Sequence, residues 1–210
     1  MPELPTHCAF EDWVEAVFAR TDPGELVDWD WDEDWHLPFD HLTKLFSSPA
    51  FLLEQYTPTQ IDQGIYYLIS PHIDDYHHVW STPHLDIQTR AGGVRTIGHL
   101  YTDLFAKLYK GLGHQNTAWP GGACYMFWDI LGIDYDAAPQ QELEASFLDI
   151  LTTALTLDSE SCWESALLGA ATEGLGFPRE TGEVLRAHNP PPSLRSYYES
   201  VLGLLITPDA

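Results

Sequence analysis

The clearest helical pattern in this 210-residue chain is the segment Pro139-Gln-Gln-Glu-Leu-Glu-Ala-Ser-Phe-Leu-Asp-Ile-Leu-Thr-Thr-Ala-Leu-Thr-Leu157. Its apolar side chains recur every three or four residues, which places them on one face of a helix with 3.6 residues per turn. They are Leu143, Phe147, Ile150, Leu151, Ala154 and Leu155. An apolar face of this kind must be buried against another element, so the segment predicts a helix packed on other helices.

The same helical spacing recurs along most of the chain. Apart from residues 28–35, no segment alternates convincingly as a β-strand. Thr57-Pro-Thr-Gln60 has the form of a capping box that opens a helix running through Ile69. Ser161-Cys-Trp-Glu164 has the same form within a predicted helix over residues 159–175. Further helices are expected over residues 9–20, 85–111, 121–131 and 193–206, with short ones from Phe39 onward. We therefore predict one all-α domain over residues 1–210, made of stacked antiparallel helices, with a degenerate HEAT-like array of helix pairs as one form of it.

An acidic segment, Asp28-Trp-Asp-Trp-Asp-Glu-Asp-Trp35, interrupts this helical pattern. In an extended backbone successive side chains point to opposite faces. One face would then carry Asp28, Asp30, Asp32 and Asp34, and the other Trp29, Trp31, Glu33 and Trp35. Because the chain offers no partner strand, we expect residues 21–38 to form a long acidic loop whose indoles contact the body of the protein.

The charge of the chain is strongly negative, with 32 Asp and Glu against nine Lys and Arg and a formal net charge of −23. Residues 21–89 alone hold thirteen acids and one base, Lys44. This balance disfavours direct binding to nucleic acid or to an anionic membrane, because both need cations that neutralise phosphate. A cationic protein is the complementary partner, and the alternative is that the acidity serves solubility alone.

The three cysteines, Cys8, Cys124 and Cys162, are odd in number and show no Cys-x-x-Cys spacing. This pattern predicts neither a disulfide framework nor a cysteine zinc site, and reduced thiols are the simplest interpretation. The N-terminus lacks the basic start and apolar core of a signal peptide, and no apolar run is long enough to cross a bilayer. We therefore expect a cytoplasmic protein without a cofactor.

A second candidate site is rich in histidine: His72-Ile-Asp-Asp-Tyr-His-His78, followed by His84 and Asp86. Imidazole and carboxylate groups are good ligands for divalent transition metals, so His72, Asp74, His77 and His78 form an alternative metal site. The segment matches no metalloenzyme motif such as His-Glu-x-x-His. Solvated or locally hydrogen-bonded side chains are therefore the competing interpretation.

One short segment resembles a known group of proteins. Ser161-Cys-Trp-Glu-Ser-Ala-Leu-Leu-Gly-Ala-Ala-Thr-Glu-Gly-Leu-Gly176 is similar to a segment of uncharacterised bacterial all-helical, HEAT-like proteins that carry histidines in a Glu-Ser-Ala-Leu-His-Gly-type run. Leu168 and Thr172 stand at the corresponding places here, so a role of those histidines does not carry over. The resemblance implies fold rather than activity.

Three functions follow from these patterns. The first is an acidic binding protein, an immunity-type or regulatory partner of a basic protein, that acts through Asp28, Trp29, Asp30, Trp31, Asp32, Asp34 and Trp35. The second is a metal-dependent hydrolase centred on residues 72–86. The third is a helical-repeat scaffold whose charge only confers solubility.

Overall fold

The fold is all-α. A computed structural model of the chain describes residues 8–20, 35–70, 79–80, 82, 84–110, 122–130 and 141–206. Of these residues 83% are helical and none lies in a strand, which confirms the predicted class. The prediction of a HEAT-like repeat stays a prediction.

The helices follow one another closely through the described part of the chain. In order they are α1 (Phe10–Phe18), α2 (His36–Ser47), η1 (Pro49–Phe51), α3 (Leu52–Gln55), α4 (Pro58–Ile69), α5 (Ile87–Arg95), α6 (Ile97–His99), η3 (Leu100–Phe105), α7 (Ala106–Leu108), α8 (Gly122–Ile130), α9 (Gln141–Thr156), α10 (Glu160–Ala171), η5 (Glu173–Gly176), α11 (Pro178–Arg186), η6 (Pro192–Leu194) and α12 (Arg195–Ile206). Helix α11 was not predicted, because its high content of charged residues hides a short apolar face that buries Leu185.

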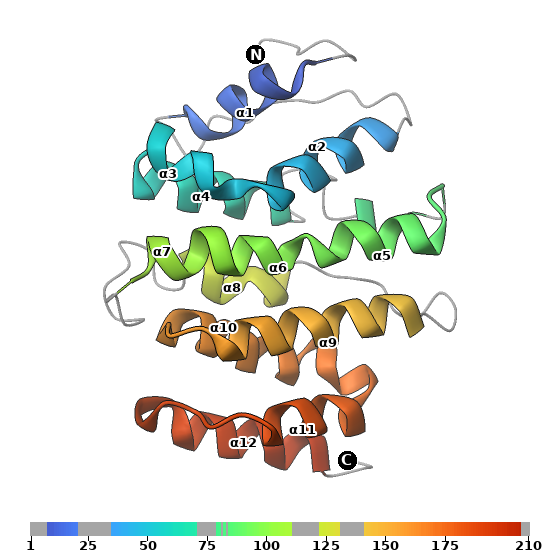
Figure 1. The fold of residues 1–210 in the computed structure, drawn as a ribbon, viewed down its shortest axis with the longest axis vertical. Coiled ribbons are helices and arrows are strands. Elements are labelled where there is room, and N and C mark those ends of the chain that lie inside the picture. The colour runs from blue at the N-terminus through green and yellow to red at the C-terminus, as the bar shows by residue number, and fades with distance from the viewer. Residues whose placement is uncertain are drawn as a thin grey trace.

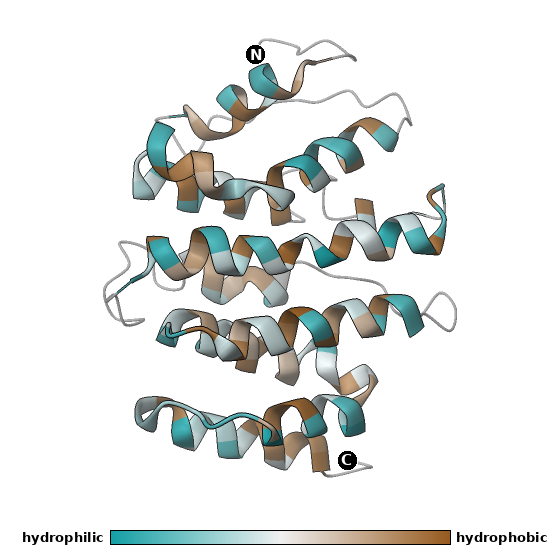
Figure 2. Cartoon of the chain, in the orientation of Figure 1, coloured by the Kyte–Doolittle hydropathy of each residue, from teal (hydrophilic) through white to brown (hydrophobic). Residues whose placement is uncertain are grey.

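The helices stack in layers from the N-terminus at one end to the C-terminus at the other (Figure 1). One column contains α4, α8, α10 and α12, each in contact with the next. The other contains α2, the run α5–α7, α9 and α11, and pairs such as α9 with α10 and α11 with α12 join the two columns. Helix α1 packs on α4 at the N-terminal end. Teal and brown positions alternate around most helices, as expected for elements with one buried face (Figure 2).

Local capping chemistry explains where several helices begin. The predicted capping box of α4 is confirmed: Gln60 N–H donates to Thr57 Oγ1, and Thr57 N–H donates to Gln60 Oε1. The predicted box at Ser161 is wrong, because α10 begins two residues earlier and the Ser159 hydroxyl accepts from Cys162 N–H. The backbone of Ser159 is extended, which is the usual conformation of an N-cap residue.

The predicted loop over residues 21–38 is wrong at its end. Residues 21–34 lie outside the described residues, but α2 begins at His36 with Trp35 as its N-cap residue. Pro38 stands in the first turn of α2, where the backbone N–H groups have no partner within the helix. Proline therefore costs the helix no hydrogen bond there, and it marks a start rather than a break.

The predicted helix over residues 85–111 is present as a continuous run from α5 to α7, with a π-helical segment, η3, inside it. At the end of η3, Ala106 N–H donates to the carbonyl of Tyr101, five residues earlier. Gly93 lies where α5 approaches two buried rings: a Cβ there would be 2.6 Å from Phe39 Cε2 and from Trp80 Cζ3. A Cβ added at the neighbouring Gly92 would instead have no heavy atom within 4 Å.

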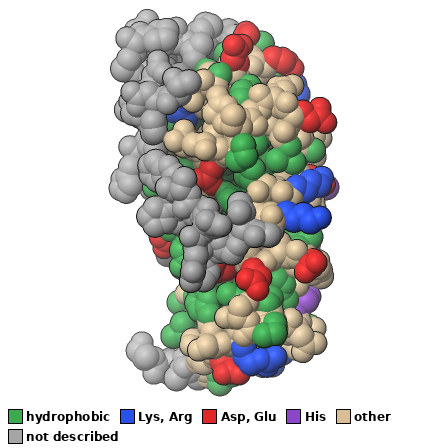
Figure 3. All heavy atoms as spheres, turned by 90° about the vertical axis from the view of Figure 1, so that its left-hand side faces the viewer, with side chains coloured by type: hydrophobic (Ala, Val, Ile, Leu, Met, Phe, Trp, Pro, Cys, Tyr) green, Lys and Arg blue, Asp and Glu red, His purple; other side chains and the backbone are tan. Residues whose placement is uncertain are grey.

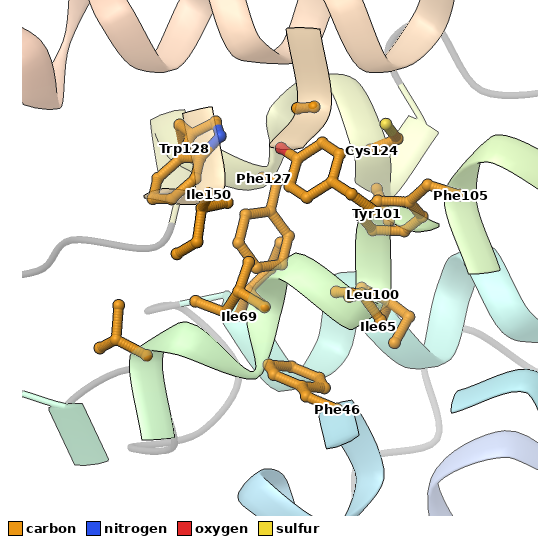
Figure 4. Close-up of a cluster of buried hydrophobic side chains, with 14 of the residues drawn as sticks. Phe46, Ile65, Ile69, Leu100, Tyr101, Phe105, Cys124, Phe127, Trp128 and Ile150 are labelled. Carbon is orange, nitrogen blue, oxygen red and sulfur yellow. The ribbon is translucent and has the colours of Figure 1, made fainter. Parts of the chain in front are cut away.

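Aromatic side chains fill the centre of the core. The Phe127 ring, on α8, lies 6.5 Å from the ring of Phe46, 6.2 Å from that of Tyr101 and 5.4 Å from that of Trp128. Figure 4 shows these rings converging from several helices. The indole of Trp128 in turn contacts Phe147 of α9 edge to face at 4.9 Å. Helix α8 is thus buried on most sides, as its apolar composition predicts.

Candidate functional site

The predicted acidic binding segment is only partly visible. Asp28, Trp29, Asp30, Trp31, Asp32 and Asp34 lie outside the described residues. Trp35 is described: it is half-buried at the start of α2 and packs against the hydrophobic core. Arg20, the last described residue before the segment, follows α1, and Trp35 precedes α2, so both belong to the N-terminal end of the stack.

Five exposed acidic side chains lie on the helices of that same end. They are Glu11, Asp12 and Glu15 on α1, Asp40 on α2 and Glu54 on α3. In Figure 3, red side chains lie at the N-terminal end of the face shown and also at its middle and C-terminal levels, whereas the larger blue groups lie at the middle and C-terminal levels. The described part of the N-terminal end is therefore acidic in its own right.

The two basic residues of this end have intramolecular partners. The Lys44 ammonium lies 3.3 Å from Glu11 Oε1 and 3.8 Å from the centroid of the Phe10 ring. The Arg20 guanidinium lies 3.9 Å from the centroid of the Tyr67 ring, and its Nε donates to the Val17 carbonyl at 3.0 Å. Both cations thus hold α1 against the helices beneath it.

The alternative metal site lies outside the structure's described ranges, which include none of His72, Asp74, His77 and His78. Asp86, which follows them, acts as the N-cap of α5: Oδ1 accepts from Gln88 N–H and Thr89 N–H, each at 3.0 Å. A hydrogen bond from the Thr89 hydroxyl, together with these two backbone hydrogen bonds, lowers the pKa of the Asp86 carboxyl. Within the described ranges, no three His, Cys, Asp or Glu side chains gather around a common point.

A buried polar cluster lies where α4, η3, α8 and α10 meet, and sequence reasoning missed it. Asp62 of α4 accepts hydrogen bonds from the Tyr109 hydroxyl and from Ala123 N–H, the latter at 2.8 Å. The carboxylate therefore serves as a cap for α8, since the first N–H groups of a helix have no partner inside it. Burial, together with the negative charge of Asp62, raises the pKa of Tyr109.

The other half of the cluster contains two cysteines from different helices. Cys124 lies in the first turn of α8 and Cys162 in the first turn of α10, and both thiols are buried. The Cys124 thiol donates to the carbonyl of Ser161, the residue before Cys162, at 3.6 Å. Beside them the Tyr101 hydroxyl and Ser165 Oγ are 2.6 Å apart.

These two cysteines have different acid–base properties. Burial raises the pKa of the Cys124 thiol well above its ordinary value. Hydrogen bonds from the Cys124 thiol and the Ser159 hydroxyl lower the pKa of Cys162. The sequence separates the two residues by a long stretch of chain, so only the packing of α8 on α10 reveals the pair.

Comparison with protein-family models, with curated proteins and with solved structures found no match. Among the helices of the described residues, none has both the length and the apolar character needed to cross a membrane.

Proposed function

We propose that this protein binds a cationic protein partner, as an immunity-type or regulatory protein does, through an acidic surface at the N-terminal end of the helical stack. The surface would combine Asp28, Trp29, Asp30, Trp31, Asp32, Asp34 and Trp35 with the exposed acids of α1, α2 and α3. Carboxylates would pair with Lys and Arg of the partner, while indoles would supply apolar contact area and cation–π contacts.

The observation that carries this proposal is the charge balance of the N-terminal end. Residues 8–70 contain thirteen Asp or Glu and only two bases, Arg20 and Lys44. Both bases already contact side chains of the protein itself, as described above. The middle run, α5–α7, is different: residues 84–110 contain four Lys or Arg and two Asp or Glu. Residues 141–206 are acidic too, with ten Asp or Glu and three Lys or Arg, so the N-terminal end has the larger excess of acids rather than the only one. A surface of one sign accelerates association with an oppositely charged partner.

The experiment compares two variants of equal net charge. The first replaces Asp28, Asp30, Asp32 and Asp34 by Asn. The control replaces four exposed acids of the C-terminal layers, Asp149 and Asp158 by Asn and Glu183 and Glu199 by Gln. Basic proteins captured from the native host by the wild-type protein are purified, and their association rates with all three proteins are measured over a range of salt concentrations.

We expect the first variant to associate about tenfold more slowly at low salt, with the difference shrinking as salt rises, because ions screen exposed charges over about 10 Å at 0.1 M. The association rate of the control variant should fall much less. Equal losses in both variants would show that total charge, and not this end of the molecule, governs binding. Unchanged binding by the four-Asn variant would refute the proposed site.

A further inference from the structure

The thiol pair at the contact between α8 and α10 is the strongest feature outside the proposed binding surface. Cys124 and Cys162 lie where α8 packs on α10, and Cys124 Sγ is 3.6 Å from the carbonyl of Ser161, the residue before Cys162. Both cysteines are almost fully shielded from solvent, with exposed fractions of 2% and 0%. Cys8, the third cysteine, lies before α1 at the N-terminal end.

We infer that Cys124 and Cys162 form a redox-sensitive dithiol, which a peroxide converts to a disulfide joining α8 to α10. Thiols that lie at one packed helix contact need little movement to reach the S–S bond length of about 2.05 Å. The inference is independent of the proposed binding function, because the pair lies in the middle of the stack.

The chemistry assigns a different role to each cysteine. The Cys162 thiolate attacks one oxygen of hydrogen peroxide, the O–O bond breaks, and the departing hydroxide takes up the thiol proton to leave as water. Cys162 then carries a sulfenic acid. The Cys124 sulfur attacks the Cys162 sulfur, the S–O bond breaks, and hydroxide leaves with the Cys124 proton as a second water. The two thiols thus lose two electrons and two protons to one peroxide.

Two features of Cys162 favour it as the attacking residue. Its N–H donates to Ser159 Oγ within the first turn of α10, where the helix dipole stabilises a thiolate. Hydrogen bonds from Cys124 and Ser159 lower its pKa. Cys8 has the opposite environment, since burial and the nearby charge of Asp12 raise its pKa.

The position of both thiols also gives an oxidant a route to them. Each lies in the first turn of its helix, and helix ends open more readily than helix centres because fewer backbone hydrogen bonds hold them. Local opening of the start of α8, where Asp62 holds Ala123 N–H, would expose the pair without global unfolding.

The test treats the reduced full-length protein, in native buffer, with increasing hydrogen peroxide. We expect the intact mass to fall by two hydrogens, peptide mapping to link Cys124 to Cys162, and a dithiol reductant to reverse both changes. Thermal unfolding of the oxidised protein should shift to a higher temperature, because the bond constrains the unfolded chain. Cys8→Ala is the matched control and should oxidise in the same way.

The order of the steps is tested with single variants and dimedone, which labels sulfenic acids. Each single variant keeps one cysteine of the pair. Dimedone should label Cys162 in the Cys124→Ala protein about ten times more than it labels Cys124 in the Cys162→Ala protein. Comparable labelling would overturn the assigned roles. Two results with the wild-type protein would overturn the inference itself, whether or not the variants fold. In the first, the pair stays reduced while Cys8 oxidises. In the second, the disulfide forms only in denaturant.

Discussion

Two adjacent glycines of α5 differ sharply in their surroundings, and this difference predicts opposite effects of the same substitution. At Gly92 an added methyl group meets nothing within 4 Å. At Gly93 it would lie 2.6 Å from Trp80 Cζ3 and 2.6 and 2.8 Å from two atoms of the Phe39 ring. Both rings are buried, at exposed fractions of 1% and 6%, so neither can swing out to solvent.

The magnitudes follow from helix propensity and packing. Replacing a helical Gly by Ala gains about 1 kcal/mol, which predicts that Gly92→Ala stabilises the protein by about that amount. Gly93→Ala makes the same gain but forces two packed rings apart, at a cost of about 3 kcal/mol at the upper end of the range for overpacked cores. The net expectation is a loss of about 2 kcal/mol for Gly93→Ala.

The assay is thermal and urea unfolding of the two variants beside the wild-type protein. For a chain of this length, 1 kcal/mol corresponds to roughly 2–4 °C in Tm. We therefore expect a rise of that size for Gly92→Ala and a fall of about 4–8 °C for Gly93→Ala. Adding Phe39→Leu to Gly93→Ala should reduce the loss, because a smaller side chain makes room for the methyl group. If Gly93→Ala is as stable as Gly92→Ala, the close packing of α5 on these rings is wrong.

Three further predictions concern single polar groups. Ser159→Ala should cost about 1 kcal/mol in urea unfolding by removing the cap of α10, and Ser159→Asp should restore most of it. Burial raises the pKa of Glu173 to about 8. The contribution of this residue to stability is therefore complete at pH values below the ordinary pKa of a Glu side chain and is lost as pH rises through about 8. Unfolding free energies measured from pH 5 to 9 should fall more steeply in the wild-type protein than in Glu173→Gln. Asp62→Ala should cost about 2–4 kcal/mol in the same assay by leaving Tyr109 O–H and Ala123 N–H without an acceptor, and a double mutant with Tyr109→Phe should lose less than the sum of the two single losses.

The sequence predicts helices where apolar spacing is regular. The stripe from Leu143 to Leu155 and the capping box at Thr57 lead directly to α9 and α4, because both signals depend only on neighbouring residues. Prediction from the sequence fails where a residue is compatible with two different local structures. The predicted loop over residues 21–38 includes Pro38, although proline is equally compatible with a first helical turn. The predicted capping box begins at Ser161, whereas Ser159 caps the helix.

The candidate sites are predictable to different degrees. Charge is a property of composition, so the acidic character of the N-terminal end was apparent without a structure. The contact between Cys124 and Cys162 was not, because it depends on how α8 packs on α10. The same holds for Asp62, whose role as a cap for a helix far along the chain requires tertiary structure.

The layered stack also determines how local opening is distributed along the molecule. Helices α1 and α12 form the two ends of the stack, whereas η3 and α8 have packed helices on either side. Amide hydrogen exchange should therefore be fastest at the two ends of the stack and slowest in the central turns of η3 and α8, because opening the middle disrupts two interfaces and opening an end disrupts one. A partner bound at the N-terminal end would slow exchange in α1 and α2 and leave α11 and α12 unchanged, so the exchange map itself would report where an unknown ligand binds.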